Sequence, residues 1–418
     1  MGLTLPVDWR SSTLGAEVDV LTGFPFPSSG YSSDGVRLVR GSNVKRGRLD
    51  WDKSITEFWP GISGEIFRYE LRNGDLVIAM DGALVGRSFA TIQQSDLPCL
   101  LLQRVARLRS SKVEQKLLAE WVGSVAFERH VDSLKTQTAI PHISPADIRS
   151  FPVLAPTSRK EQRAIVAALS DVDALIGALD KLIAKKRDLK QAAMQQLLTG
   201  QTRLPGFSGE WEAKLLRELF TFSGGLSASR DQLSDAGYCY LHYGDIHLSA
   251  KSVIDVDAEF LAIPKLNVRL GDVNASALLN DGDIVFVDAS EDDDGTSKHV
   301  VVVNPNNRPY ISGLHTIVAK SKSSDLQNTF KRYCFQTRHI KDQFRFYAVG
   351  TKVSGISKTS IAKIELRYPK SLEEQTAIAT VLSDMDAELA ALEARREKTR
   401  ALKQGMMQEL LTGRIRLV

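Results

Sequence analysis

The chain of 418 residues has 43% hydrophobic and 25% charged residues and a formal net charge of +4. These values are ordinary for a globular protein of two to four domains, and they exclude a polycation that coats nucleic acid over its whole surface. The three cysteines lie far apart and form no Cys-x-x-Cys pair, so we expect no disulfide framework, no cysteine-ligated zinc and a cytoplasmic location. Neither a signal peptide nor an apolar run of about 18 residues is visible, so we expect no membrane contact.

Residues 1–157 are predicted to form a first globular domain. Short β-branched runs alternate with Gly, Asp and Ser, which is typical of strands and turns. Asn73-Gly74-Asp75 indicates a turn, and the apolar run that begins at Leu76 indicates a buried strand after it. We therefore expect a mixed domain dominated by strands.

Residues 158–200 are predicted to form one long helix. Ser158-x-x-Glu161 has the pattern of a capping box, and Gly200 can adopt the left-handed conformation that ends a helix. The apolar residues between them alternate in steps of four and three, as in a heptad seam: Ile165, Leu169, Val172, Ile176, Leu179 and Ile183.

Residues 201–370 are predicted to form a second strand-dominated domain that resembles the first only loosely. Trp9 and Trp211 mark equivalent starts, and Asn280-Asp281-Gly282 repeats the turn before a buried strand. The second domain is about 11 residues longer, and we expect the extra residues in loops such as Ser290–Lys298.

Residues 371–418 repeat the first helix at a fixed offset of 213 residues, with identity at 24 of 44 positions from Glu161 to Leu204. The second seam runs through Ile378, Leu382, Met385, Leu389 and Leu392 and breaks at Arg395-Arg396. Two matched helices favour an antiparallel coiled coil, although a separate core helix in each of two repeated domains is the alternative. The predicted fold is α+β and pseudo-twofold, with the two chain ends close together.

The doubled order of domain and helix resembles the specificity (S) subunits of type I restriction-modification systems. The resemblance covers the whole chain and rests on Leu5-Pro6-x-x-Trp9, Glu161-Gln162 with the run that ends at Asp173, Leu197-Leu198-Thr199-Gly200, Arg203-Leu204-Pro205 before Trp211, and the second copies of these motifs. It implies two target-recognition domains that read an asymmetric, bipartite sequence in double-stranded DNA. It also implies that the helices recruit methyltransferase subunits, two in number, and that restriction subunits join in a phage-defence complex.

Two other hypotheses remain open at this stage. The chain could be a coiled-coil scaffold that joins two protein-binding domains without DNA specificity, or an enzyme with an unrecognised site. We find no phosphate-binding loop, dinucleotide loop or amino-methyltransferase tetrapeptide, so we expect no catalysis, no cofactor and no metal. The repeated carboxylates Asp171, Asp173, Asp384 and Asp386 indicate structural or partner contacts, because duplication on the helices does not suit acid–base chemistry.

DNA contacts require Lys and Arg for phosphates and a few side chains for base edges. The candidates in the first domain are Arg37, Arg40, Asn43, Lys45, Arg46, Arg48 and Arg87. The candidates in the second domain are Tyr243, His247, Lys298, His299, Arg345 and Lys352. We expect the Gly295–His299 loop to correspond to the Arg87 turn, and the acidic tip Asp292-Asp293-Asp294 to point away from the DNA backbone or to accept from a cytosine amino group.

Apolar residues near the ends of both helices are candidate contacts for partner helices. They are Leu189, Met194, Leu197, Leu198, Leu402, Met407, Leu410 and Leu411.

Overall fold

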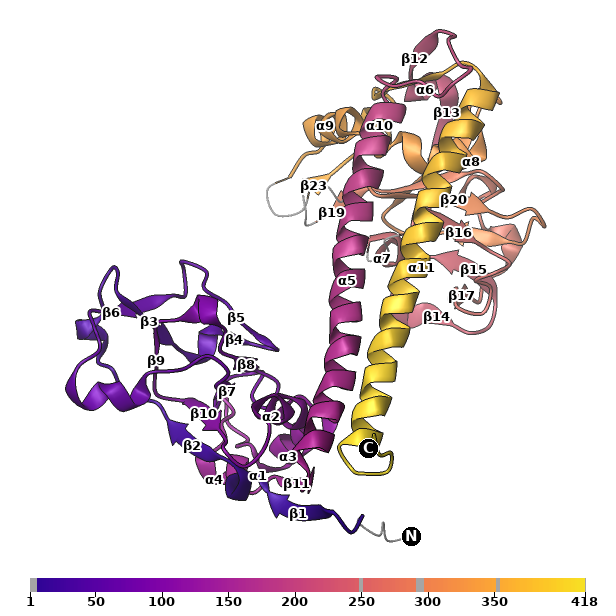
Figure 1. The fold of residues 1–418 in the computed structure, drawn as a ribbon. Helices are drawn as coiled ribbons and strands as arrows, with labels where there is room; N and C mark the ends of the chain where they lie inside the picture. Colours follow the sequence, from indigo (N-terminus) through magenta and orange to yellow (C-terminus); the bar gives the residue numbers. More distant parts are fainter. Residues whose placement is uncertain (1–5, 248–250, 291–296, 351–353, 418) are drawn as a thin grey trace. The chain divides into compact units, whose positions relative to one another are not determined.

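The computed structural model describes residues 6–247, 251–290, 297–350 and 354–417. The chain divides into two compact units (Figure 1): unit 1 is Met1–Asp180 with Ala394–Val418, and unit 2 is Lys181–Glu393. The division runs through both long helices, so each unit contains one globular domain and one half of each helix. We predicted domain boundaries at the helix starts, whereas the division into compact units falls within the two helices. Unit 1 combines segments from both ends of the chain, and unit 2 is one continuous segment.

Unit 1 is built from an antiparallel four-stranded sheet, β2-β10-β7-β8, and a three-stranded sheet, β6-β3-β9, in which β3 and β9 run parallel. Strand β7 is buried along its whole length, as the run after Asp75 predicted. The strands are β1 (Trp9–Thr13), β2 (Asp19–Thr22), β3 (Val36–Val39), β4 (Val44–Lys45), β5 (Arg48–Leu49), β6 (Glu57–Trp59), β7 (Leu76–Ala79), β8 (Phe89–Thr91), β9 (Cys99–Leu101), β10 (Val105–Arg109) and β11 (Pro152–Pro156). The helices of the domain are α1 (Leu14–Glu17), α2 (Gln115–Val122), α3 (Val125–Leu134) and α4 (Pro145–Arg149).

Unit 2 repeats this architecture with different residues. Its sheets are β13-β22-β18-β20-β16 and β14-β17-β15-β21, and β15 runs parallel to β21 as β3 does to β9. The strands are β12 (Trp211–Leu215), β13 (Phe220–Gly224), β14 (Leu233–Ser234), β15 (Tyr238–Leu241), β16 (Val253–Asp255), β17 (Lys265–Leu266), β18 (Ile284–Val287), β19 (Ala289–Ser290), β20 (His299–Val303), β21 (Tyr310–Ser312), β22 (Thr316–Ser321), β23 (Ser354–Gly355) and β24 (Glu365–Pro369). The helices of the domain are α6 (Leu216–Leu219), α7 (Tyr243–His247), α8 (Asn328–Cys334), α9 (Arg338–Tyr347) and α10 (Lys358–Ile361).

The register of equivalent strands shows where the second domain is longer. The offset between the domains is 202 residues at Val36 and Tyr238, and 208 residues at Leu76 and Ile284. About half of the extra length therefore lies between β15 and β18, where unit 2 gains strand β16. We predicted the extra residues in loops such as Ser290–Lys298, but most of them lie elsewhere in the domain, because loose sequence similarity did not fix the strand register.

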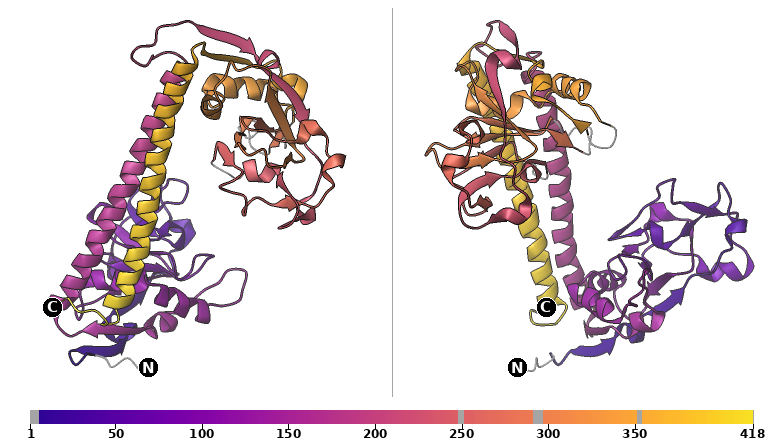
Figure 2. Two further views of the ribbon diagram at one scale, coloured as in Figure 1. Left: turned by 90° about the vertical axis from the view of Figure 1, so that its right-hand side faces the viewer. Right: turned by 180° about the vertical axis from the view of Figure 1, so that it is seen from behind.

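The two long helices are α5 (Arg159–Leu197) and α11 (Leu372–Leu410), each 39 residues long. Within each unit their halves lie side by side and antiparallel (Figure 2), which confirms the predicted pairing. Ile165, Leu169, Leu179 and Ile183 are buried along the first seam, whereas Val172 and Ile176 are half-buried. Gly200 and Gly413 adopt positive φ angles of 72° and 73°, as expected for residues that end a helix.

Among the described residues, no helix has the length and apolarity that a membrane crossing requires.

Candidate nucleic-acid interface

The same structural joint, here called the Glu–Arg joint, occurs once in each unit. In unit 2, Arg203 donates two hydrogen bonds of 2.5 and 2.6 Å to the carboxylate of Glu374, and its guanidinium lies 5.9 Å from the Trp211 ring. In unit 1, Arg416 binds the carboxylate of Glu161 and lies 5.9 Å from the Trp9 ring. The motifs shared by the two copies thus hold each unit together.

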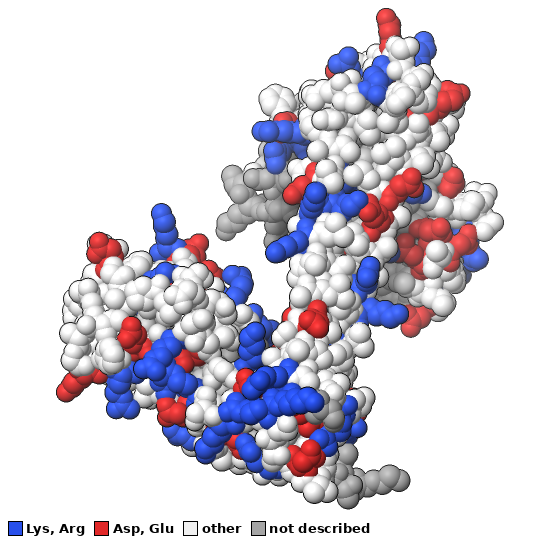
Figure 3. All heavy atoms as spheres, viewed as in Figure 1, with Lys and Arg blue, Asp and Glu red and all other residues white. Residues whose placement is uncertain are grey.

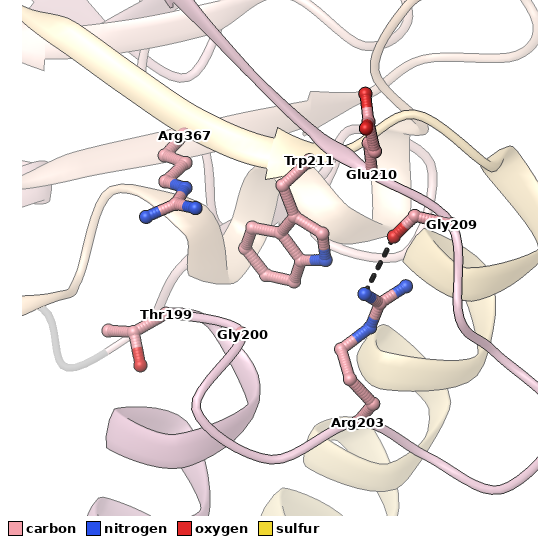
Figure 4. Close-up of a pocket in the computed structure, with 7 residues that line it drawn as sticks. All are labelled: Thr199, Gly200, Arg203, Gly209, Glu210, Trp211 and Arg367. Atoms are coloured by element: carbon pink, nitrogen blue, oxygen red, sulfur yellow. Dashed lines mark hydrogen bonds between the residues drawn. The ribbon is translucent and has the colours of Figure 1, made fainter.

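Figure 4 shows the joint of unit 2, with Arg203 and Arg367 on either side of the Trp211 indole and a hydrogen bond from Arg203 to the carbonyl of Gly209. Glycine suits position 200 because the backbone has a φ of 72° and a Cβ atom there would lie 3.2 Å from the indole. In unit 1, Gly413 packs against Trp9 in the same way, and Arg416 also bonds to Asp8 at 2.5 and 2.9 Å. These contacts confirm that the two chain ends lie close together.

The predicted capping boxes are only half correct. Ser371 accepts a hydrogen bond from the Glu374 amide at 3.2 Å, so it caps the helix as predicted. The carboxylates of Glu161 and Glu374, however, bond to Arg416 and Arg203 instead of reaching back to the cap. Both carboxylates are buried, and a buried charge is stabilised more by a guanidinium than by a single amide.

Each glutamine after these glutamates ties its helix to the adjoining domain. Gln162 accepts from the Glu114 amide at 2.9 Å and donates to the Pro156 carbonyl at 2.8 Å. Gln375 makes the same two bonds to Gln327 and Pro369, at 2.8 and 2.9 Å. Because the four bonds are equivalent, the helices leave both domains in the same local geometry.

The repeated aspartates pair the two helices, as their duplication suggested. Lys403 binds Asp173 at 2.7 Å and Glu120 of α2 at 3.2 Å. In unit 2, Lys190 pairs with Asp386, which also accepts from the Tyr333 hydroxyl at 2.9 Å. Asp173 and Asp386 therefore have a structural role.

Most of the predicted contacts for partner helices are instead part of the core of each unit. Leu197 and Leu198 pack in unit 2, and Met407, Leu410 and Leu411 pack in unit 1, with exposed fractions between 3% and 9%. Met194 lies half-buried against the core of unit 2. The helix ends bury these side chains because the adjoining domain covers them, which the sequence of the helices does not reveal. Leu189 and Leu402, at equivalent positions, remain exposed at 47% and 58%.

One edge of unit 1, here called recognition edge 1, consists of the 3₁₀ turn Gly41–Asn43 together with Asp81, Arg104 and His142. The 3₁₀ turn Gly41–Asn43 after β3 lies against Asp81, which also binds Arg104 at 3.0 Å and forms a bridge to His142. The side chain of Arg104 is 68% exposed, and its backbone has a positive φ of 65°. Arg104 was not among our predicted residues, and its left-handed backbone leaves no signal in the sequence.

The hairpin of β4 and β5 carries three predicted residues beside this edge. Arg46-Gly47 forms its turn, which Gly47 makes possible with a φ of 79°. Lys45 and Arg48 are cross-strand partners, and within the described residues neither has an ion-pair partner. Like charges opposite each other are unfavourable unless an anion lies between them. Arg46 is 53% exposed and pairs with Glu128.

Several other predicted residues of unit 1 serve the fold. Asn43 is fully buried and donates to the Asp50 and Ile55 carbonyls, which favours a structural role over a base contact. Arg40 pairs with Glu57 at 3.2 Å, and Arg37 stacks 5.0 Å from the Trp51 ring and donates to Ser95.

Arg87 binds both carboxylate oxygens of Asp132, at 2.7 and 3.2 Å, and approaches Glu128 at 3.5 Å. Hydrogen bonds from Arg87 and then Lys135 lower the pKa of Asp132 to about 2. The positive charge of Arg87 is therefore compensated by α3, which favours a structural role over the predicted phosphate contact.

The equivalent edge of unit 2, recognition edge 2, gathers aromatic and titratable groups. The ring of Tyr243 lies 5.4 Å from His315 and 4.6 Å from His242, and His315 lies 3.2 Å from Asp288. Desolvation, followed by the charge of Arg230, lowers the pKa of His242. His315 has a positive φ of 58° and occupies the position that Arg104 occupies in unit 1. Both side chains pair with an aspartate after the buried central strand, although Asp288 and Asp81 lie one position apart in the strand register.

Two predicted residues, His247 and Lys298, come together beside this edge. The amino group of Lys298 donates to the His247 carbonyl at 2.9 Å. The strand register makes Lys298 equivalent to Ser88, one residue after Arg87, which is close to the predicted correspondence. His299 is buried between Phe286 and Phe335, and burial lowers its pKa to about 4, so its position favours a role in the core. Lys352 and the acidic tip at residues 292–294 lie outside the described residues.

Charge is mixed over the face drawn in Figure 3, where Lys and Arg alternate with Asp and Glu on both globular domains.

Among the described residues, no group of three or more His, Cys, Asp or Glu side chains is arranged to bind a metal ion. All three cysteines are buried, and burial raises the pKa of Cys99 to about 12, so its thiol does not suit nucleophilic chemistry.

Residues 208–401 match the family model of the type I restriction modification DNA specificity domain, over slightly less than half of the chain. The matched segment covers the second globular domain and most of α11. The specificity subunit of the type I restriction enzyme EcoAI from Escherichia coli is 33% identical over 199 residues, which are 46% of this chain and 32% of that protein. The MjaVIII specificity subunit from Methanocaldococcus jannaschii is 27% identical over 205 residues, which are 48% of each chain. The matches therefore span less than half of the length of these relatives.

Similarity in fold to solved structures extends over nearly the whole chain. The S subunit from M. genitalium superposes with a TM-score of 0.55 at 14% identity and covers 98% of both chains. A chain from a structure of type I R-M complex assembly and conformational transition superposes with a TM-score of 0.62 at 15% identity, over 99% of this chain and all of that one. At these identities the likeness concerns the fold alone.

Proposed function

We propose that this chain is the sequence-reading subunit of a type I restriction-modification complex and is not itself an enzyme. The proposal rests on one observation: the two units share one architecture, in which the helices and their joints are alike and the recognition edges differ. The Glu–Arg joint and the paired helices are the same in both units, whereas the recognition edges differ in nearly every side chain. Two different edges suit an asymmetric, bipartite target in double-stranded DNA.

In unit 1, Lys45, Arg46, Arg48 and Arg104 are the proposed DNA contacts. Among the described residues Lys45 and Arg48 have no ion-pair partner, and these cross-strand charges support phosphate binding most directly, because a phosphate between them would relieve their repulsion. Arg104 is largely exposed and is held only at one end by Asp81.

In unit 2, Tyr243, His247, Lys298 and Arg345 are the proposed contacts. Tyr243 and its histidine neighbours offer ring faces and hydrogen-bonding groups of the kind that read base edges. Lys298 is bonded to the carbonyl of His247 in the same helix as Tyr243, and Arg345 of α9 supplies a further cation.

We further propose that the helices dock two methyltransferase subunits, which restriction subunits join, in a cytoplasmic complex for phage defence. Several exposed positions keep the same residue in both helix copies, among them Lys185 and Lys398, Leu189 and Leu402, and Gln195 and Gln408. Core packing does not explain identical residues at exposed positions, whereas contact of both helix copies with the same partner protein does.

The test is binding of the complex with its cognate methyltransferase subunit to DNA. Sequencing of methylated sites in the host identifies the target, and a scrambled duplex of the same composition is the control. At moderate salt we expect tight binding to the target alone. Equal binding to both duplexes would refute the proposal, and salt-insensitive, weak binding to either would favour a protein scaffold.

A further inference from the structure

Two large apolar side chains stand exposed at the end of α9 in unit 2. Phe346 is 81% exposed, and Val349, three residues further on, is 80% exposed. The rings of Phe346 and Tyr347 form an edge contact with centroids 5.1 Å apart. The preceding aromatic residue, Phe344, is fully buried, so the helix places one phenylalanine in the core and the other in solvent.

These side chains lie on recognition edge 2. Val349 exchanges two backbone hydrogen bonds of 2.9 Å with Gly355, and the strand that contains Gly355 pairs with β19. β19 directly follows Asp288, which binds His315 beside Tyr243. A continuous set of short contacts therefore connects the end of α9 to the cluster that we assign to base reading.

The charge of this helix favours a polyanion beside the exposed ring. Helix α9 is the equivalent of α3, and Lys341 and Arg345 occupy the positions of Glu128 and Asp132. In unit 1 these acids hold Arg46 and Arg87, so the face is neutral there. In unit 2 the same face carries these two cations, and Arg338, 86% exposed, adds a third; Asp342 pairs with both arginines, so the helix keeps a net positive charge.

Recognition edge 1 also exposes apolar side chains, although it is built from different residues. Leu84 and Ile140 are each 61% exposed. Both belong to the loops that meet where Gly82 donates to the Pro141 carbonyl at 3.0 Å, next to the bridge between Asp81 and His142. Exposed apolar residues beside cations thus occur on the equivalent edge of both units.

We propose that Phe346 is a wedge that inserts between two base pairs of the half-site bound by unit 2, with Val349 packed behind it. Apolar side chains flanked by cations can insert from the minor groove between two stacked base pairs and kink the duplex. The free-energy cost of this deformation is larger for sequences that resist unstacking. Phe346 would then contribute to specificity through DNA deformability and without a base hydrogen bond. This inference rests on the proposed function of the chain.

The experiment uses the complex with its cognate methyltransferase subunits and duplexes that carry 2-aminopurine at successive positions of the half-site for unit 2. With the natural protein we expect increased fluorescence at one base step of this half-site, together with a bend measured by energy transfer between the duplex ends. Phe346→Ala should abolish both signals and weaken binding about tenfold or more. Phe346→Leu, which keeps an apolar wedge, should retain most of the bend.

Leu261→Ala is the matched control, because Leu261 is 92% exposed and belongs to the segment after β16. It should leave fluorescence, bend and affinity unchanged. Target-specific binding that Phe346→Ala leaves intact in all three readouts would overturn the wedge and leave the proposed function standing. If the natural complex shows no preference for the target over scrambled DNA, both proposals fail together.

Discussion

Removal of the guanidinium of Arg416 tests how the shared motifs stabilise each unit. The carboxylate of Glu161 has no exposed surface, and its hydrogen bonds come from Arg416, one of them 2.8 Å long. Arg416→Ala leaves that carboxylate buried and uncompensated. Loss of one partner of a fully buried pair costs about 3–5 kcal/mol, and because the Arg416 side chain is 30% exposed we take the lower end, about 3 kcal/mol.

Amide hydrogen exchange measures this loss separately in each unit, since it reports the free energy of local opening. About 3 kcal/mol corresponds to roughly a hundredfold loss of protection. We expect that loss in β1 and β11, which pair beside the joint, and little change in β12 and β24 of unit 2. Arg203→Ala should produce the opposite pattern, because Arg203 holds Glu374 in unit 2.

Arg414→Ala is the control for Arg416→Ala, because Arg414 pairs with Glu409 at 3.3 Å while both side chains are more than a third exposed. Such a pair contributes about 0–1 kcal/mol, so protection should change by less than about tenfold. Equal effects of the two substitutions would refute the assignment of the Glu–Arg joint as the main structural role of the repeated motif.

Three further predictions follow from burial, titration and charge. Leu198→Ala should destabilise the protein by about 2–5 kcal/mol because Leu198 is 3% exposed in the core of unit 2, whereas Leu189→Ala, at a position 47% exposed, should change stability by no more than about 0.5 kcal/mol; equal losses in denaturant unfolding would contradict the reassignment of the helix ends. The pKa of Asp132 is lowered to about 2 by hydrogen bonds from Arg87 and then Lys135, so its stabilising effect is complete above its ordinary value of 3.8 and is lost as the pH falls towards 2. In an NMR titration Arg87→Ala should return this pKa towards 3.8, and an unchanged value would show that the carboxylate does not depend on Arg87. Arg345→Ala should weaken binding to target and scrambled DNA alike and reduce the slope of affinity against salt by about one; a loss confined to the target would assign Arg345 to base reading instead.

The sequence predicted the helices and their pairing because these are encoded locally and twice. The heptad steps from Ile165 to Ile183, the positive-φ glycines at positions 200 and 413, and the fixed offset all survive in the structure. The two strand-dominated domains could also be predicted, because turns such as Asn73-Gly74 precede buried strands.

Tertiary contacts were beyond this kind of prediction. Leu197 and Met407 have the same helical pattern whether a partner or the adjoining domain covers them. Asn43 and His299 carry polar groups that suit DNA, yet both are buried by strands that are distant in sequence. Arg104 was missed because its exposure depends on a left-handed backbone and on Asp81, 23 residues earlier.

Exchange of one domain tests the central claim most directly. Residues 201–370 are replaced by the corresponding segment of another specificity subunit with a known target, while both helices and the Glu–Arg joints are kept. Sequencing of methylated sites should then show a new half-site for unit 2, an unchanged half-site for unit 1 and an unchanged gap between them. A change in both half-sites, or in neither, would contradict the account that each unit reads its own part of the DNA target.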